Sequence, residues 1–164
     1  MVNLKSVHTA RKYGAIRYNI LRIVWEVFGM SNYESCTRTN YFTVSNEEKL
    51  KDIVEHIKWE NGELDFLNKE NGKWAFGGCG SICGLGSSDD EWEPNDVYEA
   101  LQKIIVQGDA IIITEIGHEK LRYLNAYSVI ITCDEIEVEE LRTRAISKAC
   151  NMLNNPEYDT QMEY

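Results

Sequence analysis

Two nearly continuous apolar segments place the tightest constraint on how this chain folds. Residues 109–117 read DAIIITEIG, and residues 125–134 read NAYSVIITCD. Runs of this length that are rich in β-branched residues are typical of strands in the middle of a sheet. Only residues 118–124 separate them, so we expect the two segments to pair with each other.

Capping and turn signals divide the rest of the chain into further elements. Ser45 and Glu48 form a capping box ahead of apolar residues at helical spacing. A second apolar stripe lies between Pro94 and Gly108, which suit a helix start and a helix end. The expected elements are a strand at 39–45, a helix at 45–59, a hairpin of strands at 63–69 and 73–78, a helix at 97–109, an edge strand at 135–138 and a helix at 139–155.

This order of elements predicts the α+β class. We expect a mainly antiparallel sheet with helices on one face. The split β-α-β arrangement of ferredoxin-like folds fits the order best. No internal repeat is visible at the periods that mark solenoids or propellers.

Charge divides the chain unevenly. The net charge is -10, but residues 1–29 carry +4, so the remaining residues carry -14. This pattern predicts a basic N-terminal extension at 1–29, a single acidic α+β domain at 30–155 and a frayed tail at 156–164. The extension has two open interpretations. It is either a basic amphipathic helix, or a non-native leader that ends at Met30, because residues 25–27 can be encoded by a purine-rich ribosome-binding sequence.

The negative net charge limits which kinds of partner the chain can bind. A surface of this charge repels phosphate backbones, so we expect a basic protein as partner and no direct binding of nucleic acid. No apolar run is long enough to span a membrane. The chain has five cysteines and no apolar secretory segment, which favours reduced thiols and a cytoplasmic location.

The Gly-rich segment at 77–86, GGCGSICGLG, is the main candidate for chemistry. Repeated glycines can cradle a phosphate, but the acidic residues that follow would repel one, so we expect a flexible connection here. Cys79 and Cys83, with His56 or His118, could in principle hold zinc, but paired half-sites are missing. His118 could also act as a general acid or base, although a surface turn is the simpler interpretation. We therefore expect no metal, no cofactor and no catalytic residue.

Two acidic groups are the candidate partner-binding surface. Trp92 and Tyr98, expected to be exposed, would act as aromatic anchors, while carboxylates around them would orient a basic partner. Capping of the following helix is the alternative explanation, since acidic residues stabilise helix N-termini. The candidate residues are Asp89, Asp90, Glu91, Trp92, Glu93, Asp96, Tyr98 and Glu99 in the first group, and Asp134, Glu135, Glu137, Glu139 and Glu140 in the second.

Two sequence motifs carry a resemblance. Residues 38–54, RTNYFTVSNEEKLKDIV, and residues 117–131, GHEKLRYLNAYSVII, resemble small, mostly uncharacterised acidic proteins of phages and mobile elements of Firmicutes. The likeness covers most of residues 36–150, and those relatives begin a few residues before the R-T-N-Y-F motif. More distantly, the pattern is similar to ferredoxin-like phage proteins. The resemblance implies a mobile-element setting.

These observations lead to three hypotheses on function. The first is a non-catalytic phage or mobile-element protein that inhibits a host defence nuclease, of the anti-CRISPR or antirestriction type, by occupying its basic nucleic-acid-binding surface. The second is a small nucleotide- or metal-binding enzyme that uses the Gly-rich segment 77–86. The third is a regulatory module that self-associates, for example as a homodimer.

Overall fold

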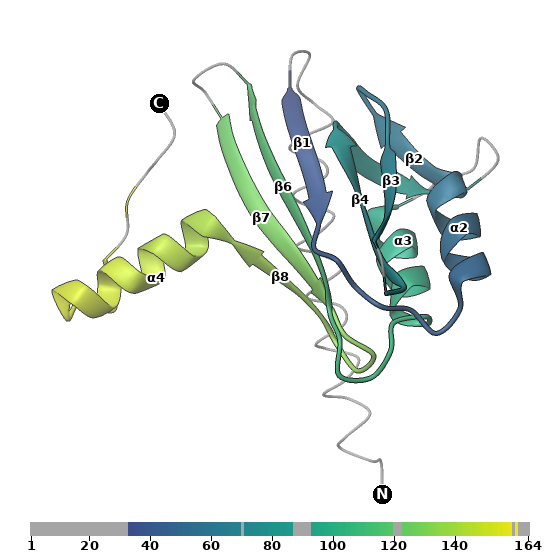
Figure 1. Cartoon of the computed structure of the whole chain (residues 1–164). Helices are drawn as coiled ribbons and strands as arrows, with labels where there is room; N and C mark the ends of the chain where they lie inside the picture. Colours follow the sequence, from purple (N-terminus) through teal and green to yellow (C-terminus); the bar gives the residue numbers. More distant parts are fainter. Residues whose placement is uncertain (1–32, 70, 87–92, 120–122, 159, 161–164) are drawn as a thin grey trace, which may run out of the picture.

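The computed structural model describes residues 33–69, 71–86, 93–119, 123–158 and 160 (Figure 1). The expected leader at 1–29 and the residues Asp89, Asp90, Glu91 and Trp92 lie outside the described residues. The elements are β1 (Glu34–Thr39), α2 (Glu47–His56), β2 (Ile57–Glu60), β3 (Asp65–Lys69), β4 (Lys73–Cys79), β5 (Ser81–Leu85), α3 (Pro94–Gln102), β6 (Ile111–Glu119), β7 (Tyr123–Ile131), β8 (Ile136–Glu140) and α4 (Leu141–Leu153).

Most strands belong to one antiparallel sheet of six strands, in the order β3-β4-β1-β6-β7-β8. The two segments that opened the sequence analysis pair as β6 and β7, from Ile111 opposite Ile131 to Glu119 opposite Tyr123. Strand β1 inserts between the β3–β4 hairpin and the β6–β8 meander. A second sheet contains β2 and β5. The expected α+β class and mainly antiparallel sheet are therefore confirmed.

One face of the large sheet is covered and carries the core. Leu50, Ile53 and Val54 of α2 and Val97, Tyr98 and Leu101 of α3 are buried there. They pack in one cluster with residues of the sheet, among them Ile111, Ile113, Val129 and Ile131. Figure 1 shows α3 behind the six-stranded sheet, while the opposite face is turned toward the viewer.

The last helix differs from the other two. We expected the helix at 139–155 to lie with the others on one face of the sheet, but no residue of α4 is buried. Leu141, Met152 and Leu153 are all exposed, and Figure 1 shows α4 extending away from the sheet beyond β8. Among the described residues, no helix combines the length and apolar character needed to cross a membrane.

Several element boundaries differ from the prediction. The first strand lies at Glu34–Thr39, earlier than the predicted span 39–45. Within that span, isolated bridges join Phe42 to Trp74 and Val44 to Ile105.

The helix boundaries also differ. Helix α2 is capped by Asn46, whose side chain accepts from the backbone N–H of Lys49. It ends at His56 because residues 57–60 pair with β5. Helix α3 ends at Gln102, so the buried Ile104 and Ile105 follow the helix rather than extend it.

The Gly-rich segment is not a flexible connection. Its residues form the end of β4 and all of β5. The glycines are needed because other backbone approaches them closely: a Cβ on Gly78 would lie 2.2 Å from the Glu63 carbonyl oxygen, and one on Gly80 would lie 1.9 Å from that of Glu60. The chain's own backbone therefore fills the space that a phosphate would need.

The ferredoxin-like split β-α-β arrangement is not confirmed. After β1, the chain passes through α2 into β2, which belongs to the smaller sheet. Both neighbours of β1 in the large sheet, β4 and β6, run antiparallel to it.

Candidate functional site

The most unusual buried group is the carboxylate of Glu115, in the middle of β6. Its exposed fraction is 2%, although its neighbours along the strand are mostly isoleucines. Four hydroxyl groups lie within hydrogen-bond distance of its two oxygens. Tyr33 and Ser81 contact Oε1 at 3.2 and 3.0 Å, and Thr37 and Tyr127 contact Oε2 at 3.2 and 2.9 Å.

The strand pattern explains how these groups meet. Glu115 lies on the covered face of β6, between Ile113 and Gly117 in the alternation of the strand. Gly117 makes room for Tyr33, because a Cβ there would lie 2.0 Å from the Tyr33 hydroxyl. Thr37 comes from the neighbouring strand β1, and its one hydroxyl proton is shared between Glu115 and the carbonyl oxygen of Gly80, which lies 2.7 Å away. The cluster thus joins both sheets.

Burial dominates the electrostatics of this cluster. Desolvation raises the pKa of Glu115, and the hydrogen bonds from the surrounding hydroxyls oppose that rise. Burial also raises the pKa of Tyr33, Tyr98 and Tyr127, and it raises the pKa of the Cys83 thiol to about 12. These phenols and this thiol are therefore protonated at neutral pH, and the protonated hydroxyls of Tyr33 and Tyr127 can donate to Glu115. The cluster has the character of an internal network that fixes the fold.

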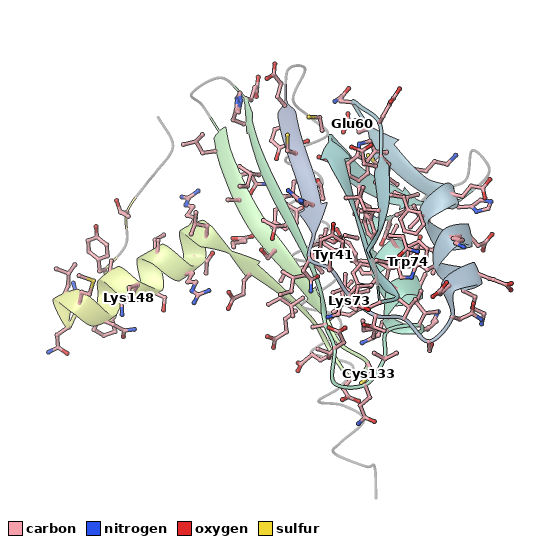
Figure 2. All side chains as sticks on the ribbon, in the orientation of Figure 1. Tyr41, Glu60, Lys73, Trp74, Cys133 and Lys148 are labelled. Atoms are coloured by element: carbon pink, nitrogen blue, oxygen red, sulfur yellow. The ribbon has the colours of Figure 1, made fainter. Side chains whose placement is uncertain are left out.

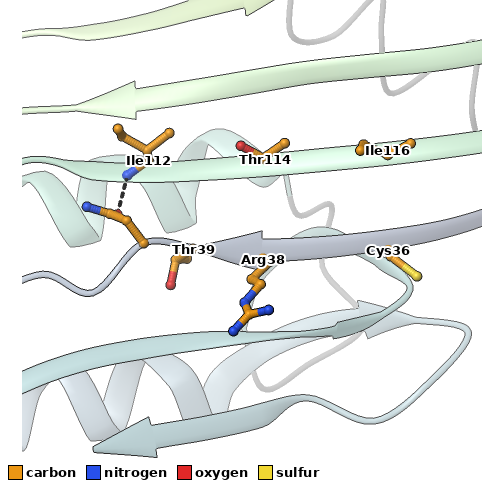
Figure 3. Close-up of a pocket in the computed structure, with 7 residues that line it drawn as sticks. Cys36, Arg38, Thr39, Ile112, Thr114 and Ile116 are labelled. Carbon is orange, nitrogen blue, oxygen red and sulfur yellow. Dashed lines mark hydrogen bonds between the residues drawn. The ribbon is translucent and has the colours of Figure 1, made fainter. Parts of the chain in front are cut away.

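The opposite face of the same sheet is open. A shallow groove of about 410 Å³ runs along β1 and β6 and is lined by Cys36, Arg38, Thr39, Asn40, Ile112, Thr114 and Ile116 (Figure 3). The side-chain oxygen of Asn40 accepts from the backbone N–H of Ile112 at 2.8 Å. Ile116 is 62% exposed, and Leu124 on the adjacent strand β7 is 79% exposed.

The first predicted acidic group is only partly described. Glu93 caps α3 and forms a capping box with Asp96, as the alternative explanation expected. Glu99 is exposed. The prediction that Tyr98 is an exposed aromatic anchor is wrong. Its side chain is 2% exposed and packs in the core, so it cannot contact a partner. Its place beside the apolar residues Val97 and Leu101 of the helix was a signal for burial.

The second predicted acidic group lies around β8. Asp134 is exposed and Glu135 is partly buried at the turn before the strand. Glu137 and Glu139 alternate with the core-facing Ile136 and Val138, so they point to the open face.

The end of β8 is tied to the start of α4. Glu139 forms an ion pair with Arg144 at 2.8 Å, and Glu140 accepts from the Thr143 hydroxyl at 2.8 Å. The acidic residues at the start of α3 belong to the helix layer, on the other side of the sheet. The fold therefore separates Glu137 and Glu139 from the described part of the first group.

The other chemical candidates are not brought together. Cys83 is buried, whereas Cys79 is exposed. His118 lies 3.9 Å from Glu34 on the open side, and His56 contacts the backbone carbonyl of Asp52 within α2. In the part of the chain that the structure describes, no group of three or more metal-ligating side chains occurs.

Comparisons with known proteins add no relatives. No protein-family model matches the sequence, and no curated protein or solved structure is significantly similar to it.

Proposed function

We propose that this chain is a non-catalytic acidic binding protein that docks on a basic, nucleic-acid-binding surface of a partner protein. The observation that carries the proposal is the open face of the six-stranded sheet. It has exposed apolar side chains on the inner strands β6 and β7, Ile116 and Leu124, and carboxylates on the edge strand β8, Glu137 and Glu139. An apolar centre with a charged rim is typical of protein-binding surfaces.

The charge of the chain favours a basic partner. Residues 30–164 carry a net charge of -14, which would steer such a partner toward the protein and repel nucleic acid. Together with the resemblance to small proteins of phages and mobile elements, this supports a host defence nuclease, RNA-guided or of the restriction type, as the target. The open face replaces residues 89–99 as the main docking surface in this proposal.

The geometry supports the enzymatic alternative less well. The glycines of the segment 77–86 make room for the chain's own backbone, as at Gly77, where a Cβ would lie 2.6 Å from the Thr37 carbonyl oxygen. The buried carboxylate of Glu115 is enclosed by hydroxyls, so a substrate would have no approach to it. Neither feature offers a place for a nucleotide.

Charge reversal on the open face tests the proposal. The full chain is assayed for inhibition of DNA cleavage by a panel of purified RNA-guided nucleases and restriction endonucleases. For any nuclease that it inhibits, the double variant Glu137→Lys/Glu139→Lys should raise the half-inhibitory concentration by about tenfold or more, because close charge pairs contribute more than about 1.4 kcal/mol. Inhibition should also weaken as salt is added.

The matched control changes the net charge equally on the other layer. Glu48 and Glu55 are exposed on α2, so the variant Glu48→Lys/Glu55→Lys should inhibit almost as well as the unaltered chain. Equal losses in both variants would show that charge alone, and not the open face, produces inhibition. Failure to inhibit any nuclease of the panel would remove the nuclease as target.

Self-association is a second candidate function, and α4 favours it. This helix presents Leu141, Met152 and Leu153 to solvent and buries none of its residues. A second copy of the chain could cover them. Sedimentation should then show a dimer that dissociates in the variant Leu141→Asp/Leu153→Asp, and a monomer at all concentrations would exclude this function.

A further inference from the structure

Two exposed cysteines from distant parts of the sequence face each other on the open side of the sheet. Cys36 lies on β1 and Cys79 lies at the end of β4, and the ladder places them directly opposite each other. Their sulfur atoms are 3.4 Å apart, and the thiol of Cys36 donates to that of Cys79. The other three cysteines have no such partner among the described residues.

The register of the ladder suits a covalent link. The backbone N–H of Gly80 donates to the Ser35 carbonyl at 2.8 Å, so Ser35 and Gly80 are the hydrogen-bonded pair. Cys36 and Cys79 come next and therefore form a non-hydrogen-bonded pair, in which the two Cα atoms approach to about 4.5 Å. Disulfides need Cα separations of roughly 4.4–6.8 Å, so both chains can remain in place when the bond forms.

The backbone around both residues is held firmly. Strand β1 is paired on both sides, with β4 and with β6. The carbonyl of Cys79 accepts from the Trp59 indole N–H at 2.8 Å, and a Cβ on Gly62 would lie only 2.0 Å from that carbonyl oxygen. The closeness of the two thiols is thus a property of the packed fold and does not depend on a loop.

We propose that Cys36 and Cys79 form a two-thiol site that a peroxide converts into a cross-strand disulfide. One thiol, as thiolate, attacks hydrogen peroxide: an S–O bond forms and the O–O bond breaks, which gives a sulfenic acid. The leaving hydroxide takes up the proton that the thiol lost and becomes the first water. The second thiol then attacks that sulfur: the S–S bond forms, the S–O bond breaks, and the second water leaves. In total, two thiols and one hydrogen peroxide give one disulfide and two waters.

The position of the site links it to the groove. Cys36 lines the groove together with Ile116, its partner across the β1–β6 ladder. Oxidation removes a thiol from this surface and ties β1 to β4 covalently. The hydrogen bond to Cys79 raises the pKa of Cys36, so less of this thiol is ionised at neutral pH. Because the thiolate is the form that reacts, we expect oxidation to become faster as the pH rises.

Peptide mapping of the oxidised full chain tests the proposal. The reduced protein is treated with hydrogen peroxide at low stoichiometry, the remaining thiols are alkylated, and the digest is analysed by mass spectrometry without reduction. We expect loss of two of the five thiols, a linked peptide that joins residues 36 and 79, and full reversal by dithiothreitol.

Three serine variants provide the controls. Cys36→Ser and Cys79→Ser should each abolish the linked peptide, and the remaining thiol should then be trapped by dimedone as a sulfenic acid. Cys133→Ser removes another exposed thiol and should leave the linked peptide unchanged. Circular dichroism spectra equal to that of the unaltered chain show that the variants are folded.

Other results would overturn the proposal. These are linked peptides that involve Cys133 or a second chain in place of the 36–79 link, or sulfenic acid at residue 36 that persists beside an intact Cys79. Equal rates of thiol loss in the unaltered chain and in both single variants would do the same.

Discussion

At two neighbouring residues of β6, the two faces of the six-stranded sheet invert the usual relation between side-chain polarity and burial. On the covered face of β6, the carboxylate of Glu115 is almost completely buried. On the open face of the same strand, one residue further along, Ile116 is largely exposed. Figure 2 shows side chains projecting from the sheet on the open side, where none of the described helices covers them. Strand β6 therefore buries a carboxylate inside the fold and exposes an apolar side chain to solvent.

This difference in burial indicates separate roles for the two faces of the sheet. The covered face needs internal partners, and hydroxyls from β1, β5, β7 and Tyr33 supply them to Glu115. The open face has exposed isoleucines that no described element covers, which is the pattern of a surface that another protein completes. Stability should thus depend on one face and binding on the other, and the following experiments test that division.

Removal of the buried carboxylate should have the largest effect. In Glu115→Ala, the buried hydroxyls of Tyr33 and Tyr127 lose Glu115 as acceptor and a cavity remains, so the free energy of unfolding should fall by about 3–5 kcal/mol. Urea denaturation measures the change. Glu137→Ala, on the open face, is the matched control and should shift stability by no more than about 0.5 kcal/mol. A loss below about 1 kcal/mol in Glu115→Ala would mean that the network does not stabilise the fold.

Identical truncations on the two faces of β6 should differ in the same direction. Ile113 is buried in the core, so Ile113→Ala should cost about 2–5 kcal/mol, because a cavity remains. Ile116→Ala should cost less than about 1 kcal/mol. Thermal or urea unfolding of the pair measures the difference. Similar losses would indicate that the open face is covered in the free protein.

Gly117→Ala should have an intermediate effect. The new methyl group would overlap the Tyr33 hydroxyl, so the ring must move away from Glu115, at a cost of about 1–3 kcal/mol. The same substitution in a Tyr33→Ala background should cost much less, because the clash is gone. A double-mutant cycle from urea unfolding gives this coupling, and additive effects would exclude the proposed contact.

Sequence reasoning succeeded where the pattern is local. The pairing of residues 109–117 with 125–134 and the β3–β4 hairpin follow from apolar runs and short connections, and the structure confirms both. The N-cap of α2 is misplaced by only one residue, because Asn46 and Ser45 are both good capping residues. Ser45 instead donates its hydroxyl to the carbonyl of Ile104.

Sequence reasoning failed where contacts between segments far apart in the chain determine the structure. The pairing of β2 with β5 joins two short strands that carry no strong pattern of their own. Glycines that permit close packing, such as Gly78, resemble glycines of a loop in sequence. The burial of Glu115 depends on hydroxyls contributed by distant strands, and a carboxylate within an isoleucine-rich run was the one available signal.

The change in the free energy of unfolding with pH should be the smallest of these effects. It shows whether desolvation or hydrogen bonding dominates the pKa of Glu115. Desolvation raises its pKa above the ordinary 4.5, so the folded chain binds this proton more tightly than the unfolded chain does. The stabilisation from the protonated group is complete below about pH 4.5 and is lost as the pH rises through the higher pKa of the folded state. The phenols of Tyr33, Tyr98 and Tyr127 and the thiol of Cys83 all have raised pKa values, so they do not titrate in this range.

Glu115→Gln removes this titration and serves as the reference. Urea unfolding between pH 4 and pH 8 should show that the free energy of unfolding of the unaltered chain falls relative to that of Glu115→Gln as the pH rises. The opposite trend would mean that the hydrogen bonds from the hydroxyls outweigh desolvation and lower the pKa of the carboxylate. In that case, the covered face would hold Glu115 as a preferred anion, and its burial would add to the stability of the fold at neutral pH.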